Sequence, residues 1–185
     1  RRPRLYSVMP YYDGELLEAR LKRSPMTLGE GVEIGIKLAK AVYVLNRARI
    51  IHRDIKPENV MLRDGGLKLL DLGVARLPGL DGDADAAVPG TPSYMAPELY
   101  TGARGDERSD VYALGVTLYR SFSAGHYPYG EVEPFMRPRF ARRTPLSRYR
   151  PDLPAWLDDV LAKATAVDPE RRFGDAMELA FALEN

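Results

Sequence analysis

Residues 50–62, with the sequence IIHRDIKPENVML, place a histidine, an arginine, two acids, a lysine and an asparagine between two short apolar runs. Apolar residues on both sides bury the flanks of such a segment and hold the polar groups between them in one place. Asp54, Lys56 and Asn59 are therefore expected to face a common cleft. Their chemistry, and the segments that complete it, decide what kind of protein this is.

The segment that follows this charged loop is typical of a β-hairpin that turns at Asp64, Gly65 and Gly66. Such a hairpin brings Asp71, at the end of its second strand, back beside Asn59. Mg²⁺ accepts amide and carboxylate oxygens and commonly takes only one or two protein ligands together with phosphates. The pair is a candidate metal site, although an isolated Asp and Asn are also common in turns.

Two side chains inside the charged loop suit further roles. The carboxylate of Asp54 could accept a proton from an incoming hydroxyl, and the ammonium group of Lys56 could stabilise negative charge on a transferred group. By residue type, the loop and the hairpin predict phosphoryl transfer. His52 lies within an apolar run, so we interpret it as a packed residue, and the two histidines of the chain indicate no metal site.

Hydrophobic periodicity elsewhere predicts a mainly helical chain with a small β-hairpin at one edge. Thr27 and Glu30 form the capping box of a long helix over residues 27–50. Residues 109–124 are apolar almost all round and predict a buried helix. The other expected elements are a strand at 5–9, a short helix at 15–23, amphipathic helices at 154–166 and 174–185, and loops at 74–93 and 125–153.

Composition limits the classes of protein that fit. The chain has 185 residues, 45% hydrophobic and 29% charged, as is typical of a globular protein. The net charge of +1 gives no general attraction to nucleic acid or membranes, and no apolar run is long enough to span a bilayer. The absence of cysteine excludes disulfides and fits a cytoplasmic location. The chain opens RRPRLYSV without a methionine, so we expect it to be part of a longer protein.

Three motifs occur in order along the chain: HRDIKPEN at 52–59, DLG at 71–73 and GTPSYMAPE at 90–98. Together they resemble the catalytic loop, the metal-binding Asp-Phe-Gly and the end of the activation segment of eukaryotic-like, bacterial-type serine/threonine protein kinases. The resemblance covers nearly the whole chain. It implies a protein-kinase-like fold, of which this chain would hold the C-terminal lobe only.

The resemblance assigns roles to the residues of the charged loop. It implies that Asp54 is the catalytic base and that Asn59 and Asp71 hold Mg²⁺. It also implies that Lys56 contacts the γ-phosphate of ATP, and a lysine at this place is the serine/threonine form of the motif.

Further positions match structural residues of the family. Thr91 resembles a residue that bonds the catalytic Asp and Lys, and Asp110 resembles a buried acid that holds the backbone of the catalytic loop. Glu98 and Arg172 match a structural ion pair that does not touch ATP.

The sequence YSVMPYYDG near the start of the chain resembles the last strand of the small lobe and the hinge. Met9 then falls at the gatekeeper position. Tyr11 or Tyr12 would supply the backbone N–H that meets adenine, because Pro10 has none. Met61 would form the apolar floor beneath the adenine, although a methionine there is equally plausible as core filler.

The chain also departs from the family pattern. It contains no glycine-rich phosphate loop, no strand lysine and no partner glutamate, which are the parts that position ATP. We therefore expect residues 1–14 to be the last small-lobe strand and the hinge, and residues 15–185 to be a C-terminal lobe that is poorly active alone. Leu72 replaces the usual Phe, and another apolar side chain should be tolerated there.

Two charged segments leave alternatives open. Between the DLG and GTP motifs there is no Ser or Thr, so an acid could stand in for a phosphate beside Arg53, or the acids could simply be solvated. These acids are Asp81, Asp83 and Asp85. The basic stretch at 134–156 could favour acidic substrates, form a partner surface or be a solvated loop. This stretch also looks like bacterial chains that fuse a metal-dependent phosphatase to a kinase.

The resulting hypothesis is a serine/threonine kinase that uses ATP and Mg²⁺ on a protein substrate, with its small lobe in the same polypeptide. No nucleic-acid or membrane partner is expected within this segment. The alternative is a non-catalytic pseudokinase or scaffold, against which the complete set of large-lobe residues argues. A small-molecule phosphotransferase is disfavoured, because in protein kinases the motif at 90–98 receives a protein substrate.

Overall fold

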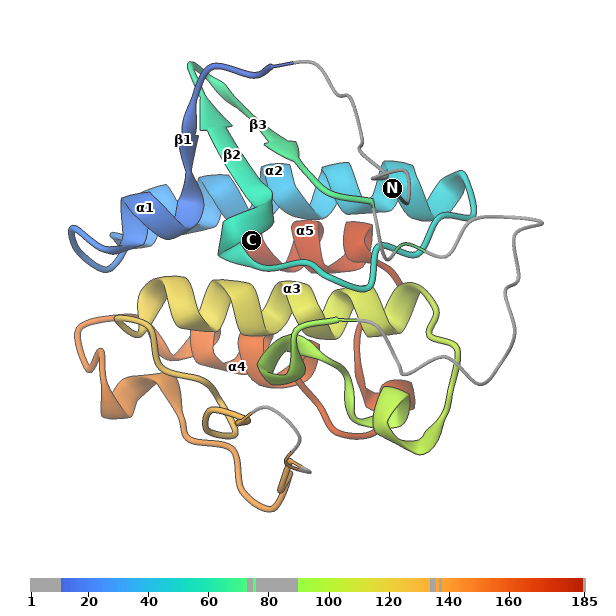
Figure 1. Cartoon of the computed structure of the whole chain (residues 1–185). Coiled ribbons are helices and arrows are strands. Elements are labelled where there is room, and N and C mark those ends of the chain that lie inside the picture. Colours follow the sequence, from blue (N-terminus) through green and yellow to red (C-terminus); the bar gives the residue numbers. More distant parts are fainter. Residues whose placement is uncertain (1–10, 73–74, 76–89, 134–135, 137, 185) are drawn as a thin grey trace, which may run out of the picture.

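The computed structural model describes residues 11–72, 75, 90–133, 136 and 138–184 (Figure 1). The strand expected at 5–9 lies outside these residues. The fold is mainly helical, with one small sheet at an edge, as the periodicity predicts. In chain order the helices and strands are β1 (Glu15–Leu16), α1 (Leu17–Leu21), α2 (Leu28–Arg47), β2 (Val60–Arg63), β3 (Gly66–Leu69), α3 (Glu107–Phe122), α4 (Ala155–Ala164) and α5 (Ala176–Glu184).

The long helix α2 begins where its cap predicts. The hydroxyl of Thr27 accepts a hydrogen bond from the backbone N–H of Glu30 at 3.3 Å. The carboxylate of Glu30, however, receives the guanidinium of Arg20 in two bonds of 2.8 and 2.7 Å. Only the Thr27 half of the predicted capping box is therefore formed. The Glu30 side chain instead links α1 to the first turn of α2.

The helix α3 is buried along most of its length, as its composition predicts. Its N-cap is Asp106, whose carboxylate accepts from the N–H groups of Arg108 and Ser109, while the Ser109 hydroxyl accepts from the N–H of Asp106. Figure 1 shows α3 running between α2 and α4, and it also contacts α5. The core of the molecule is therefore built around α3.

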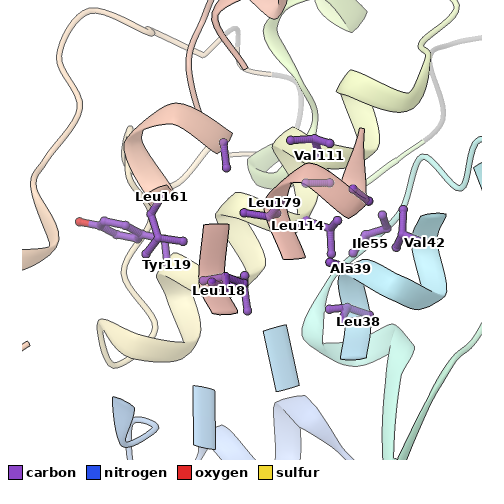
Figure 2. Packing of buried hydrophobic residues seen from close by; sticks show 14 of the residues in the cluster. Leu38, Ala39, Val42, Ile55, Val111, Leu114, Leu118, Tyr119, Leu161 and Leu179 are labelled. Carbon is purple, nitrogen blue, oxygen red and sulfur yellow. The ribbon is translucent and has the colours of Figure 1, made fainter. Parts of the chain in front are cut away.

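Close packing ties the charged loop to this core. Leu114 and Leu118 of α3 lie among side chains from α2 and α5 (Figure 2). Ile55, from inside the charged loop, is fully buried in the same cluster, and the hydroxyl of Thr117 on α3 donates to its carbonyl oxygen at 3.3 Å. The loop is therefore anchored from below by an apolar side chain and a buried hydrogen bond.

The sheet is antiparallel, with the strand order β1-β2-β3. In the hairpin, Val60 pairs with Leu69 and Arg63 pairs with Gly66, so the turn consists of residues 64 and 65 alone. Gly65 has a φ of +70°, a conformation that glycine adopts without steric cost. The predicted hairpin is confirmed, with Gly66 already in the second strand.

The short helix expected from residue 15 starts later than predicted. Glu15 and Leu16 pair with Leu62 and Met61 as β1, and α1 begins at Leu17. The backbone approaches β2 so closely at Gly14 that a Cβ atom there would lie 2.4 Å from the carbonyl oxygen of Leu62. Pairing with a strand distant in sequence outweighs the local helical periodicity here.

The described part of residues 125–153 is irregular apart from a 3₁₀ turn at Leu146–Arg148, as its composition predicts. The two amphipathic helices expected near the end of the chain are present as α4 and α5. Among the described residues, none of the helices is long and apolar enough to cross a membrane.

Candidate active site

Asp54 is the centre of a hydrogen-bonded cluster in the charged loop. Its Oδ1 accepts from both the N–H (3.1 Å) and the hydroxyl (2.8 Å) of Thr91. Its Oδ2 lies 2.9 Å from the Lys56 ammonium and accepts from the Asn59 amide at 3.0 Å. Lys56 also donates to the Thr91 hydroxyl at 2.6 Å, which closes a ring of three side chains. The structure therefore brings four of the predicted site residues together.

The cluster keeps the Asp54 carboxyl group ionised. Burial by itself raises the pKa of Asp54, but the hydrogen bonds from Lys56 and Thr91 and the charge of Lys56 outweigh it. The net result is a pKa below the ordinary value for an aspartate. At neutral pH this group is a hydrogen-bond acceptor only.

Asp110 holds the backbone of the loop from beneath. Its side chain is fully buried on α3 and accepts from the N–H of His52 (2.9 Å) and of Arg53 (3.0 Å). Arg53 has a φ of +64°, a left-handed conformation that is costly for a residue with a side chain. Two hydrogen bonds to one carboxylate thus fix the sharp bend immediately before Asp54.

His52 connects the loop to the hairpin. It is fully buried, its Nε2 lies 3.0 Å from the carbonyl oxygen of Leu70, and its Nδ1 accepts from the N–H of Asp54 at 3.3 Å. A proton on Nε2 satisfies both contacts, since that nitrogen then donates and Nδ1 accepts. The ring spans from the loop to the residue that precedes Asp71.

The hairpin brings the predicted metal pair close together in the backbone. The N–H of Leu70 donates to the carbonyl oxygen of Asn59 at 2.7 Å, so Asp71 follows the residue directly opposite Asn59. Both N–H groups of the Asn59 amide are directed at Asp54, one to its carbonyl oxygen at 2.8 Å and one to Oδ2. The amide oxygen is thereby left as the atom that could bind a cation. The described residues hold no group of three or more His, Cys, Asp or Glu side chains fit for a metal ion.

Glu98 and Arg172, which are far apart in the sequence, form a bidentate salt bridge. Arg172 donates to the two carboxylate oxygens of Glu98 at 2.8 and 2.7 Å. Its side chain is fully buried, and its remaining donors reach the carbonyl oxygens of Arg108, Ala166 and Val167. Burial raises the pKa of Glu98, but Arg172 outweighs it and the net pKa lies below the ordinary value. The pair ties the segment after Thr91 to the C-terminal helices.

Comparison with known proteins decides the family. Residues 1–181 match the family described as the protein kinase domain. The chain belongs to the protein kinase family. The resemblance seen in the three motifs is confirmed, and the mainly helical architecture agrees with the C-terminal-lobe part of that fold.

Bacterial kinases are among the relatives of this kinase chain. A probable serine/threonine-protein kinase of Streptomyces coelicolor is 36% identical over 186 residues, which cover 97% of this chain and 28% of the relative. Serine/threonine-protein kinase PknB of Mycobacterium tuberculosis is 36% identical over 185 residues, 96% of this chain and 29% of the relative. PknK of the same species is 40% identical over 128 residues, 68% of this chain and 11% of the relative. The chain thus spans less than a third of the length of these relatives.

The residues predicted to form the hinge are only partly described. Met9 lies outside the described residues. Tyr11 is 90% exposed, and Tyr12 stacks beneath the Lys68 ammonium, 3.6 Å from the ring centre. Met61 is half-buried in β2, where it pairs with Lys68. The acids Asp81, Asp83 and Asp85 also lie outside the described residues, so their proposed pairing with Arg53 stays a prediction.

Two residues that position the site were not predicted. Asn46 of α2 donates to Asp110 at 2.9 Å and to the carbonyl oxygen of Ile50 at 3.1 Å. Its place four residues after the buried Val42 could have indicated that it faces inward. Arg120 of α3 donates to the Tyr94 hydroxyl at 2.7 Å, and no pattern in the sequence indicates this contact.

Proposed function

We propose that this chain is the catalytic-loop-bearing lobe of a serine/threonine protein kinase that transfers the γ-phosphoryl group of ATP to a protein hydroxyl. In this proposal residues 1–14 are the last small-lobe strand and the hinge, and residues 15–185 are the C-terminal lobe. The observation that carries the proposal is the cluster in which Thr91, Lys56 and Asn59 all point at the Asp54 carboxylate.

The chemistry of Asn59, Asp71 and Lys56 fits Mg²⁺ and ATP, the two groups that protein kinases use. Asn59 and Asp71 supply the hard oxygen ligands that Mg²⁺ prefers, and a small number of protein ligands is usual when phosphates complete the shell. When bound, Mg²⁺ with ATP supplies the phosphoryl group and neutralises charge on its oxygens. Lys56 would contact that phosphate, because its ammonium is a mobile point charge with three donors.

Asp54 would act as the acceptor for the substrate hydroxyl. A carboxylate offers about four lone-pair sites, and in this structure four donors occupy them. A substrate hydroxyl must therefore displace one donor. Lys56 is the suitable one, since moving toward a phosphate frees a site on Asp54 Oδ2. The hydroxyl would then donate to Asp54, which orients its oxygen for attack and takes the proton. As the new P–O bond forms, the bond from the γ-phosphorus to the β,γ-bridging oxygen breaks, and ADP leaves with that electron pair.

The test uses the full-length protein that carries this chain, with ATP, Mg²⁺ and a Ser-containing protein substrate. Asp54→Asn should lower phosphate transfer by at least about 10³-fold, because the amide cannot accept the proton. The matched control is Asp159→Asn, which changes an exposed carboxylate on α4 in the same way. Turnover by Asp54→Asn within tenfold of the wild type would contradict the role of Asp54.

A further inference from the structure

A cleft of about 440 Å³ lies between the connection from α1 to α2 and the C-terminal end of α3. We call it the α1–α3 cleft. Its charged lining residues are Glu18, Lys22, Arg23 and Arg120. Three cations and one acid give the cleft a net positive lining, whereas the chain as a whole is nearly neutral.

Arg120 is the fixed cation of this cleft. Its side chain is only 25% exposed, its Nε donates to the carbonyl oxygen of Gly125 at 3.2 Å, and its Nη1 donates to the Tyr94 hydroxyl at 2.7 Å. The guanidinium also lies 5.0 Å from the ring centre of Tyr127. Three neutral contacts of this kind hold an arginine in place, but they do not cancel its charge.

No carboxylate bonds closely to Arg120 within the described residues. The nearest is Glu58, whose Oε1 lies 3.9 Å from Nη1, beyond hydrogen-bonding distance. Burial raises the pKa of Tyr94 well above its ordinary value, so this phenol stays neutral beside the cation. The positive charge of Arg120 is therefore available to an additional anion.

The other charged residues of the cleft are paired on the surface. Lys22 lies 2.9 Å from Glu18, and Arg23 bonds to Glu15. Lys22 and Arg23 are 72% and 61% exposed, so water screens these pairs strongly and an approaching anion can share the cations. Lys22 and Arg23 add to the positive electrostatic potential at the cleft, but they do not hold a bound anion in one orientation.

Arg120, which lines the cleft, contacts two residues that lie close in sequence to the candidate active site. Glu58 follows Lys56 by two residues, and Tyr94 follows Thr91 by three. Arg120 thus touches the two segments that supply donors to Asp54. A peptide whose hydroxyl reaches Asp54 would have its neighbouring side chains within the field of Arg120.

We propose that the α1–α3 cleft binds an anionic side chain of the protein substrate, a carboxylate or a phosphate close in sequence to the accepting Ser or Thr, with Arg120 as the specificity-determining residue. This inference rests on the proposed function and names its substrate class. A planar guanidinium held by neutral partners suits a carboxylate or phosphate, which it can meet with two parallel hydrogen bonds. A basic side chain in the same place would be repelled.

The test measures kcat/KM of the full-length protein on matched Ser peptides. Each peptide carries Glu, phosphoserine, Gln or Arg at one position within four residues of the acceptor. The best anionic peptide should exceed its Gln counterpart by about tenfold, and the advantage should shrink at high salt. The Glu and phosphoserine peptides show which anion the cleft favours.

Substitution then assigns the preference to the cleft. Arg120→Gln should abolish the preference for the anionic peptide, and Arg120→Lys should keep part of it. Lys22→Gln with Arg23→Gln should weaken it by about two- to threefold without disturbing the buried contacts of Arg120. Arg47→Gln, an exposed arginine at the far end of α2, is the matched control and should retain the full preference.

The outcomes separate this inference from the proposed function. If the wild type phosphorylates peptides but treats Glu, phosphoserine and Gln alike, or prefers Arg, the cleft does not select anions. The same holds if Arg120→Gln and Arg47→Gln keep identical preferences. If the wild type transfers phosphate to no peptide or protein, the proposed function itself fails. If Arg120→Gln does not fold, the exposed Lys22 and Arg23 double variant decides.

Discussion

At the scale of single residues, the site depends on a few buried charged groups that organise backbone. Asp110 is fully buried, and its two carboxylate oxygens accept three hydrogen bonds, from His52, Arg53 and Asn46. Burial raises the pKa of Asp110, which means that desolvation opposes its charged form despite these bonds. Burying this charge is therefore unfavourable for stability. A carboxylate is nevertheless suited to this position, because it can accept several hydrogen bonds at once and so fix the backbone bend before Asp54.

Asp110→Asn should test that role. The amide keeps the shape of the carboxyl group but turns one acceptor into a donor, so at least one N–H of the loop loses its partner. We expect the free energy of unfolding to fall by about 1–3 kcal/mol and the amides of His52 and Arg53 to exchange faster with solvent. Urea unfolding and hydrogen exchange measure both effects. Unchanged exchange at these two amides would show that Asp110 does not fix the loop.

The ion pair of Glu98 and Arg172 predicts a pH-dependent stability. Arg172→Met should lower the free energy of unfolding at pH 7 by about 3–5 kcal/mol, because it leaves a mostly buried carboxylate unpaired. The pKa of Glu98 is lowered in the folded state, so its contribution is complete above about pH 4.3 and is lost as pH falls through the folded value.

Urea unfolding of the wild type and of Arg172→Met from pH 7 to pH 3 checks this prediction. The difference between the two proteins should shrink as the pH falls toward 3, because protonation of Glu98 removes the pair from the wild type and the unpaired buried charge from the variant. A difference that stays constant over this range would show that lost packing of Arg172, and not its charge, carries the effect.

At the scale of elements, local patterns predicted the helices well and the tertiary contacts less well. The cap at Thr27 and the apolar period located α2, and the polar turn located the hairpin, because both signals arise within a few neighbouring residues. The strand at Glu15 and Leu16 was not predicted, since its partners Leu62 and Met61 lie more than forty residues away. A close approach between two backbones requires a glycine, such as Gly14, but the sequence does not show which segment the glycine approaches.

Two glycines of α2 illustrate the difference and give a matched test. A Cβ atom at Gly31 would lie 2.2 Å from the ring of Phe122, which is fully buried and has no room to move away. A Cβ atom at Gly29 would meet nothing within 4 Å. Gly31→Ala should therefore destabilise the protein by about 1–3 kcal/mol through overpacking. Gly29→Ala should stabilise it by about 0.5–1 kcal/mol through helix propensity.

Thermal and urea unfolding of the two variants decide between these effects. Opposite signs would show that the packing of α2 on α3 requires glycine at position 31. Stabilisation by both substitutions would mean that α2 and α3 can separate at that point without cost.

At the scale of the whole molecule, the candidate site is assembled by packing across the chain. Three motifs in order predicted Asp54, Asn59 and Asp71, and the hairpin register agrees with the expected proximity of the last two. The contacts of Asn46 with Asp110 and of Arg120 with Tyr94 span 64 and 26 residues. Such partners are set by how helices pack, and neither periodicity nor a motif encodes them.

The last prediction concerns this chain by itself. One continuous core joins α2, α3, α4 and α5, so the 185-residue chain should fold alone and unfold cooperatively. In the proposed function Asn59 and Asp71 hold Mg²⁺ and Lys56 contacts the γ-phosphate, but the chain has no glycine-rich loop and no strand lysine. Its affinity for ATP with Mg²⁺ should therefore be at least about a hundredfold weaker than that of the full-length protein, because the clamping contacts are absent.

Calorimetric titration of both proteins with ATP and Mg²⁺ measures this ratio, and thermal unfolding of the isolated chain shows that it is folded during the titration. Asp71→Asn in the full-length protein provides the control for the metal pair, since it should weaken binding only when Mg²⁺ is present. Equal affinities of the isolated chain and the full-length protein would contradict the assignment of residues 15–185 as one lobe of a two-lobed enzyme. They would place the whole nucleotide site within the residues that carry the charged loop.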